Sequence, residues 1–235
     1  MPLKTLLIVV LLLPVLAHAQ GRPLATIDSN LYPYQSRIDN DTDLTFIANA
    51  QLPARFSYFG YANFRGAMTG ASFDFSRSEQ NLRWAISERS PLDLNLQAIL
   101  VDGSGNDFAQ LGLSWRVHNT PGLSELFRRI NLIYRITFHL KSFGSVDNNV
   151  WQTEQFFSMK FPAISDRFYM SGFIDQTYNR DGPEALPKNP VVAEVQAGFR
   201  LWKNFYGVAE YRVNDFRLGN EYNLAVGIEY KHAWH

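Results

Sequence analysis

The stretch Ile130 to Lys141, with the sequence INLIYRITFHLK, decides the fold of this chain. Its side chains divide into two alternating sets: Ile130, Leu132, Tyr134, Ile136, Phe138 and Leu140 on one face, and Asn131, Ile133, Arg135, Thr137, His139 and Lys141 on the other. A period of two over this length predicts a β-strand and not an amphipathic helix. The length also fits a tilted membrane-spanning strand, which needs about 9–11 residues.

Further stretches repeat this alternation along the chain. The clear ones are 92–100, 109–118, 167–175, 191–201 and 222–231. Less regular strands are expected at 43–51, 54–65, 79–88, 149–161 and 204–214. The chain is also rich in aromatic residues, with 18 Phe, 11 Tyr and 5 Trp, which favour strands and line the two interfaces of membrane barrels.

The links between the expected strands alternate in length. The short ones are 52–53, 89–91, 162–165 and 202–204, and the longer polar ones are 66–78, 102–107, 142–148, 179–189 and 215–220. This alternation is typical of an antiparallel up-and-down barrel in the outer membrane, with short periplasmic turns and longer outer loops. The link 119–129 falls where a short turn is due. Thr120-Pro121 before Leu123 and Leu126 predicts a short periplasmic helix near 121–128.

The direction of the first strands requires one strand more. If 52–53 is a periplasmic turn, the strand before it runs inward, so the chain must already have crossed the membrane once. The available segment is 24–38, where alternation is poor and Pro33 is tolerable only at an edge or a strand end. Because bacterial barrels have even strand numbers, we predict about 12 strands. Ten strands, with the N-terminal segment folded into the lumen, are the alternative.

The N-terminus has the pattern of a secretory signal peptide. Lys4 precedes the apolar run Leu6 to Leu16, and Ala17-His18-Ala19 forms a small-x-small cleavage site. The run is too short to cross a bilayer as a helix, which takes roughly 20 residues. We therefore expect a signal peptide at 1–19, an N-terminal segment with a weak first strand at 20–42, and an outer-membrane barrel at 43–235. Export and barrel-assembly machinery are the expected partners of such a chain.

A soluble periplasmic sandwich or lipocalin-like barrel is the rival architecture, because alternation alone does not say which face points inward. The polar faces carry many charges that would be costly to bury in a dry core. The last strand ends in an aromatic region, Tyr230 to Trp234, like the assembly signal of outer-membrane proteins, although His235 stands where Phe is usual. These features favour the membrane. The balance of 22 basic against 22 acidic residues argues against a nucleic-acid partner.

The alternation predicts which side chains line the lumen and meet a solute. They are Arg116, Arg135, His139, Glu154, Phe156, Arg167, Tyr169, Phe173, Asp175, Glu194, Arg200, Tyr206, Glu210, Arg212 and Glu229. In a pore, the charged members set a field for a solute and the aromatic members stack on planar or sugar-like ligands. The alternative roles are an ion-pair ladder that stiffens a narrow barrel, and aromatic packing or an interface girdle.

Enzymatic activity is not expected, although a lipid-modifying hydrolase is an alternative. Such an enzyme needs a nucleophile beside a base. The nearest candidates are His139 and Ser142, which lie on opposite faces if the strand is regular, while Ser114 and Ser171 are candidates from other strands. No spacing of His or acidic residues predicts a metal site, and no cofactor is expected.

Two segments resemble the nucleoside-specific channel (Tsx-like) class of Gram-negative outer-membrane barrels. They are Trp151 to Tyr178 (WQTEQFFSMKFPAISDRFYMSGFIDQTY), with a short turn between aromatic strands, and Leu224 to Tyr230 (LAVGIEY). The resemblance implies a porin-like channel among membrane lipids that passes small hydrophilic solutes such as nucleosides. A non-conducting structural or adhesion barrel, active through the loops 66–78 and 179–189, remains the other alternative.

Overall fold

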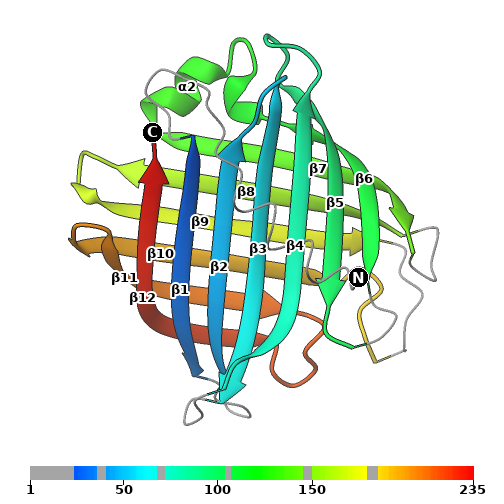
Figure 1. Ribbon diagram of the computed structural model, residues 1–235, viewed down its shortest axis with the longest axis vertical. Helices are drawn as coiled ribbons and strands as arrows, with labels where there is room; N and C mark the ends of the chain where they lie inside the picture. Colours follow the sequence, from blue (N-terminus) through cyan, green and yellow to red (C-terminus); the bar gives the residue numbers. More distant parts are fainter. Residues whose placement is uncertain (1–23, 36–40, 68–71, 104–106, 145–149, 179–184) are drawn as a thin grey trace.

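The computed structural model is a closed barrel of twelve antiparallel strands in which each strand pairs with its sequence neighbours and β1 pairs with β12 (Figure 1). It describes residues 24–35, 41–67, 72–103, 107–144, 150–178 and 185–235. The strands are β1 Ala25–Gln35, β2 Asp41–Gln51, β3 Phe56–Ala67, β4 Asp74–Ala85, β5 Leu92–Val101, β6 Phe108–Trp115, β7 Leu132–Phe143, β8 Trp151–Phe161, β9 Ser165–Tyr178, β10 Val191–Trp202, β11 Phe205–Asn214 and β12 Tyr222–Trp234. The predicted fold class is confirmed.

The weak first strand closes the barrel. β1 lies within the predicted interval 24–38 and forms part of the wall between β2 and β12. Its pairing with β12 is interrupted at Tyr32 and Pro33, between the pairs Leu31–Ile228 and Tyr34–Ala225, where proline has no N–H to donate. The ten-stranded alternative is therefore excluded. The predicted signal peptide, 1–19, lies outside the described residues.

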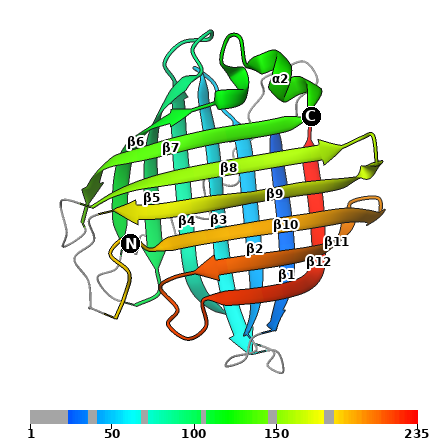
Figure 2. The ribbon, with the colours of Figure 1, turned by 180° about the vertical axis from the view of Figure 1, so that it is seen from behind.

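The short links and the only helices of the described chain lie at one end of the barrel. The 3-10 turn η3 (Val117–Asn119) and the helix α2 (Ser124–Arg129) stand at the same end as the C-terminal end of β12 (Figure 2). The predicted short helix is thus confirmed. In both views the β1–β5 wall crosses the β7–β11 wall steeply, as strongly tilted strands require. No helix in the described ranges is long and apolar enough to cross a membrane.

One strand is displaced from its predicted position. β4 was expected at 79–88 and instead spans Asp74–Ala85, so it extends into the predicted loop 66–78. Its first residues continue the ladder with β3, where Asp74 pairs with Arg65 and Arg77 with Asn63. Backbone pairing with β3 extends β4 at its N-terminal end. The sequence pattern of one strand contains no information about such pairing.

The outer face of the barrel is apolar and the inner face is polar. Leu140 and Val226 expose 66% and 65% of their surface, whereas Asn95 and Thr137 are fully buried. A protein that folds in water has the opposite arrangement. This inversion excludes the soluble sandwich or lipocalin-like alternative and fits strands surrounded by lipid.

A β-bulge in β7 changes which side chains face inward near its end. Gly112 of β6 pairs with His139 and Leu111 pairs with Lys141, so Leu140 is an extra residue on β7. After the bulge Lys141 is exposed and Ser142 is buried. Two expectations assumed a regular strand and are therefore wrong: that Lys141 shares the face of His139, and that Ser142 lies on the opposite face.

Candidate functional site: the barrel lumen

Two cavities fill the interior of the barrel and meet at its middle. The inner cavity, nearer the short links, has a volume of about 430 Å³, and the outer cavity, nearer the long links, has about 630 Å³. Both are lined by residues that we call the junction: Tyr61, Asn63, Phe173, Asp175, Glu194 and Arg212. The lumen is thus lined by charged, polar and aromatic side chains, and the six junction residues border both cavities.

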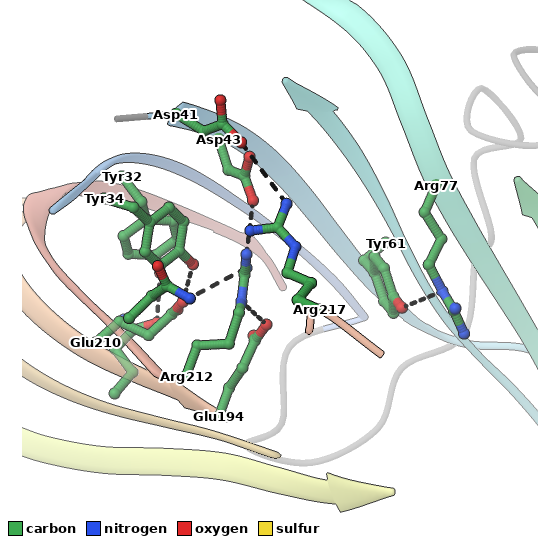
Figure 3. Close-up of polar contacts among 12 residues, drawn as sticks. Tyr32, Tyr34, Asp41, Asp43, Tyr61, Arg77, Glu194, Glu210, Arg212 and Arg217 are labelled. Atoms are coloured by element: carbon green, nitrogen blue, oxygen red, sulfur yellow. Dashed lines mark hydrogen bonds and ion pairs between the residues drawn. The ribbon is translucent and has the colours of Figure 1, made fainter. Parts of the chain in front are cut away.

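Arg212 is the centre of the densest charge cluster in the lumen, which we call the Arg212 network (Figure 3). Its Nη1 lies 2.9 Å from Asp43 Oδ2, and its Nε donates to Glu194 Oε1 at 2.6 Å. A third carboxylate, Glu210, lies 3.7 Å from Nη2 and accepts a hydrogen bond from the Tyr34 hydroxyl. The guanidinium also lies 4.2 Å from the centre of the Tyr34 ring. Three strands, β2, β10 and β11, are joined through this one side chain.

The network continues toward the long links through two more arginines. Arg65 Nε donates to Asp43 Oδ1 at 2.9 Å and lies 3.5 Å from Asp41 Oδ2. Arg217, in the link after β11, lies 3.6 Å from the same Asp41 oxygen (Figure 3). Asp41 and Asp43 therefore each lie within ion-pair distance of two guanidinium groups.

A second polar cluster lies on the wall of β4, β5, β7 and β8. Gln97 Nε2 donates to Glu79 Oε1 at 2.7 Å and to Glu154 Oε2 at 3.2 Å, so one amide joins the two carboxylates. Arg83 and His139 lie 3.6 Å and 3.7 Å from Glu154. All five side chains are buried. Glu154 contacts Gln97, Arg83 and His139, and Glu79 contacts Gln97.

A third cluster lies in the inner cavity around Tyr169. The Tyr169 hydroxyl donates to Glu229 and accepts a hydrogen bond from Gln196 Nε2. Lys231 Nζ lies 3.2 Å from Glu229 Oε1 and 3.9 Å from the centre of the Tyr169 ring. The ring lies across Gly198, where a Cβ would overlap it, so glycine at this position lets the tyrosine lie flat on the wall.

Two charged side chains of the inner cavity differ from these clusters. Arg135 and Asp175 line the cavity, yet neither makes a hydrogen bond or ion pair with another described residue. They stand on β7 and β9, beside the aromatic residues Phe156 and Phe173. These two charged side chains therefore face the cavity beside aromatic rings without a hydrogen bond or ion pair to any described residue.

Most side chains predicted for the lumen line the inner cavity. These are Arg135, Glu154, Phe156, Tyr169, Phe173, Asp175, Glu194, Glu210, Arg212 and Glu229. His139 is buried behind them beside Glu154, and the Tyr206 ring packs edge-on against Tyr169 at 5.7 Å. The inward-facing positions of β7 to β12 thus place most of the predicted residues on the wall of the inner cavity.

Three predicted residues lie away from both cavities. Arg116 pairs with Asp93 at 3.0 Å near the short-link end. Arg167 donates to the backbone carbonyls of Arg200 and Leu201, and Arg200 pairs with Asp166 at 2.8 Å. These arginines sit at the ends of their strands, where a side chain can turn to the rim instead of into the lumen.

The first strands contribute lumen residues that the sequence reasoning missed. They include Tyr34, Asp43, Tyr61, Arg65, Arg77 and Glu79. Alternation in these strands is irregular, but Leu44 and Phe46 face away from Asp43 and Thr45, and Phe46 is exposed on the outer surface. The apolar residues Leu44 and Phe46, which alternate with Asp43 and Thr45, could have predicted that Asp43 faces inward.

Two of the three candidate nucleophiles, Ser142 and Ser114, have partners other than His139. The bulge puts His139 and Ser142 on the same side, but Ser142 Oγ accepts a hydrogen bond from Gln110 Nε2 at 3.1 Å. Ser114 Oγ lies 2.9 Å from Thr137 Oγ1. Within the described residues no serine hydroxyl is hydrogen-bonded to His139, so this geometry does not favour a serine hydrolase.

Comparison with known proteins places the fold. No protein-family model and no curated protein sequence matches the chain. Among solved structures, the KdgM porin aligns with a TM-score of 0.52 and 12% identity over 89% of this chain and 99% of that one, and so does KdgM in complex with disordered oligogalacturonate. The NanC porin aligns with a TM-score of 0.55 and 11% identity over 87% and 98%. At this identity the likeness concerns the fold alone, and the chain is an outer-membrane-type β-barrel built like these porins.

Proposed function

We propose that the protein is an outer-membrane channel for the passive passage of small hydrophilic solutes and has no enzymatic activity. The observation that carries the proposal is the pair of cavities inside the barrel, both lined in part by charged side chains, that share the junction residues. Charged side chains in such a space replace part of the hydration shell of a solute and select among solutes. The porin fold of the structural neighbours supports the same function.

We further propose that the solutes include planar, nucleoside-like molecules. Phe59, Tyr61, Phe156, Tyr169 and Phe173 line the inner cavity and present aromatic surface to it. A planar base gains from stacking on such rings, by about 0.5–1.5 kcal/mol for a good pair. The hydroxyl groups of a ribose match the carboxylates and amides between the rings.

Conductance of the refolded full chain in a planar lipid bilayer tests the channel. We expect discrete conductance steps, and we expect adenosine to reduce the current more than ribose does, because only adenosine has a ring to stack. Correct folding is checked first by the shift in gel mobility that an unheated barrel shows. A folded barrel that conducts at no voltage would contradict the channel, and equal effects of adenosine and ribose would contradict the nucleoside proposal alone.

Cell fractionation and N-terminal sequencing test the proposed route to the outer membrane. We expect the protein in the outer-membrane fraction, with Gln20 as its first residue after cleavage behind Ala19. A protein that keeps its first residues, or that remains in the periplasmic fraction, would contradict this route.

A further inference from the structure

A row of side chains runs across the β7–β11 wall at one height. Arg135 pairs in register with Phe156, Phe156 with Phe173, and Phe173 with Glu194, which in turn pairs with Arg212. The four members from Arg135 to Glu194 line the inner cavity. The two phenylalanines therefore stand side by side on neighbouring strands, between a cation and an anion of the same row.

The cation at the start of this row, Arg135, has no hydrogen-bond or ion-pair partner among the described residues, and its buried Nε lacks an acceptor. The acidic residue nearest to it along the neighbouring strand is Glu154, two positions from Phe156. Glu154 is already held by Arg83, His139 and Gln97. The guanidinium is therefore available to an anion in the cavity.

An acidic residue beside the row, Asp175, likewise has no hydrogen-bond or ion-pair partner in the described part of the chain. Asp175 lies two positions from Phe173 on the same inward face of β9, and its buried Oδ1 accepts no hydrogen bond. Arg77, from the opposite wall, shares the outer cavity with it. The Arg77 guanidinium instead donates to the Tyr61 hydroxyl at 3.1 Å and lies 3.7 Å from Glu79. Asp175 thus makes no ion pair with a described residue, and Glu154 lies directly opposite it on β8. A cation in the cavity would reduce the repulsion between these two acidic groups.

We propose that Arg135, Phe156, Phe173 and Asp175 form a subsite for small zwitterions that carry a planar ring, of which an aromatic α-amino acid is the simplest. The proposal rests on the channel function above and specifies its solute. A guanidinium binds a carboxylate through paired N–H donors, a carboxylate binds an ammonium, and the two rings stack on a third. A zwitterion pairs both unused charges, whereas a neutral nucleoside gains only the stacking.

Single-channel current block by four related solutes tests the subsite in the refolded full chain. Tryptophan carries the ring and both charges, tryptamine lacks the carboxylate, indole-3-propionate lacks the ammonium, and alanine lacks the indole ring. We expect tryptophan to block at the lowest concentration. We expect Arg135→Gln to weaken block by tryptophan and indole-3-propionate by about tenfold, the effect of one charge-assisted hydrogen bond, and to leave tryptamine unchanged.

Asp175→Asn gives the reciprocal test. It should weaken block by tryptophan and tryptamine about tenfold and leave indole-3-propionate unchanged. Phe156→Leu should weaken block by all three ring solutes and not by alanine. Arg128→Gln, in the exposed helix α2 outside the lumen, is the matched control and should change nothing.

The outcomes separate the subsite from the channel. A conducting barrel that tryptophan blocks no better than alanine would overturn the subsite and leave the channel intact. If Arg135→Gln weakened block by tryptophan and by tryptamine equally, this would also overturn the subsite, because Arg135 would then not bind the carboxylate. Absence of all conductance in a folded barrel would overturn the channel itself.

Discussion

Two regions of the same lumen use arginine and acidic residues in opposite ways. In the Arg212 network, one guanidinium contacts Asp43, Glu194 and Glu210, and Asp43 is 0% exposed. In the subsite on β7 to β9, Arg135 and Asp175 face a cavity and contact no oppositely charged described residue. The residue types are alike, and only their partners differ. Paired charges join strands, while unpaired charges remain available to a solute.

The largest expected effect comes from breaking the paired region. Arg212→Met should lower the free energy of unfolding by about 3–5 kcal/mol, because it leaves buried carboxylates without their shared cation. Urea unfolding of the refolded barrel in lipid vesicles, followed by tryptophan fluorescence, measures this change. Arg200→Met is the matched control, since its pair with Asp166 is at the exposed rim. If Arg212→Met and Arg200→Met were equally stable, the claim that the Arg212 network stabilises the barrel would be wrong.

A smaller loss in the free energy of unfolding is expected from a change in the third cluster, around Tyr169. This cluster also consists of paired groups and lies in the inner cavity. Tyr169→Phe removes the donor to Glu229 and the acceptor of Gln196. We expect a loss of about 1.5–3 kcal/mol, the range for a buried hydrogen bond to a charged group. The same unfolding measurement applies, with Tyr222→Phe on the exposed outer face as the control. A loss no larger than that of the control would show that the hydroxyl does not stabilise the barrel.

Removing the unpaired arginine should affect stability least among the lumen variants. Arg135→Met makes the same change as Arg212→Met, in the same lumen, but breaks no ion pair. We expect the free energy of unfolding to change by no more than about 1 kcal/mol, with current block affected instead. A loss as large as that of Arg212→Met would mean that Arg135 has a structural partner.

The smallest effect is expected where a pair is complete but exposed. Hydrogen bonds from Arg129 and Arg128 hold the pKa of Glu125 on α2 below its usual range. A lowered pKa in the folded state means that the stabilisation is present at neutral pH and is lost as the pH falls through that pKa. Water screens this pair, so the stability change should be small. NMR titration should show the pKa of Glu125 rising in Arg129→Gln; no rise would contradict the role of these bonds.

Much of the barrel was predictable because alternation in β5, β6, β7, β9, β10 and β12 is regular. The same regularity placed Phe173 and Asp175 on one inward surface. It failed in β7 after Leu140, where one inserted residue reversed the faces of Lys141 and Ser142. It also failed for Arg167 and Arg200, because at a strand end a long side chain can reach the rim. Alternation describes a regular strand and contains no information on bulges or ends.

The sequence by itself predicted an up-and-down barrel and favoured twelve strands over ten. A period of two assigns alternate residues to two faces, and the parity of the links requires a strand near 24–38 despite Pro33. The tertiary structure alone decided which charges are paired. Arg212 and Asp43 are 169 positions apart and meet only because the barrel closes. Arg135 has no ion pair with any residue that the structure describes, because Glu154 is held by Arg83 from the opposite wall. Pairing depends on distances across the lumen, which no local pattern encodes.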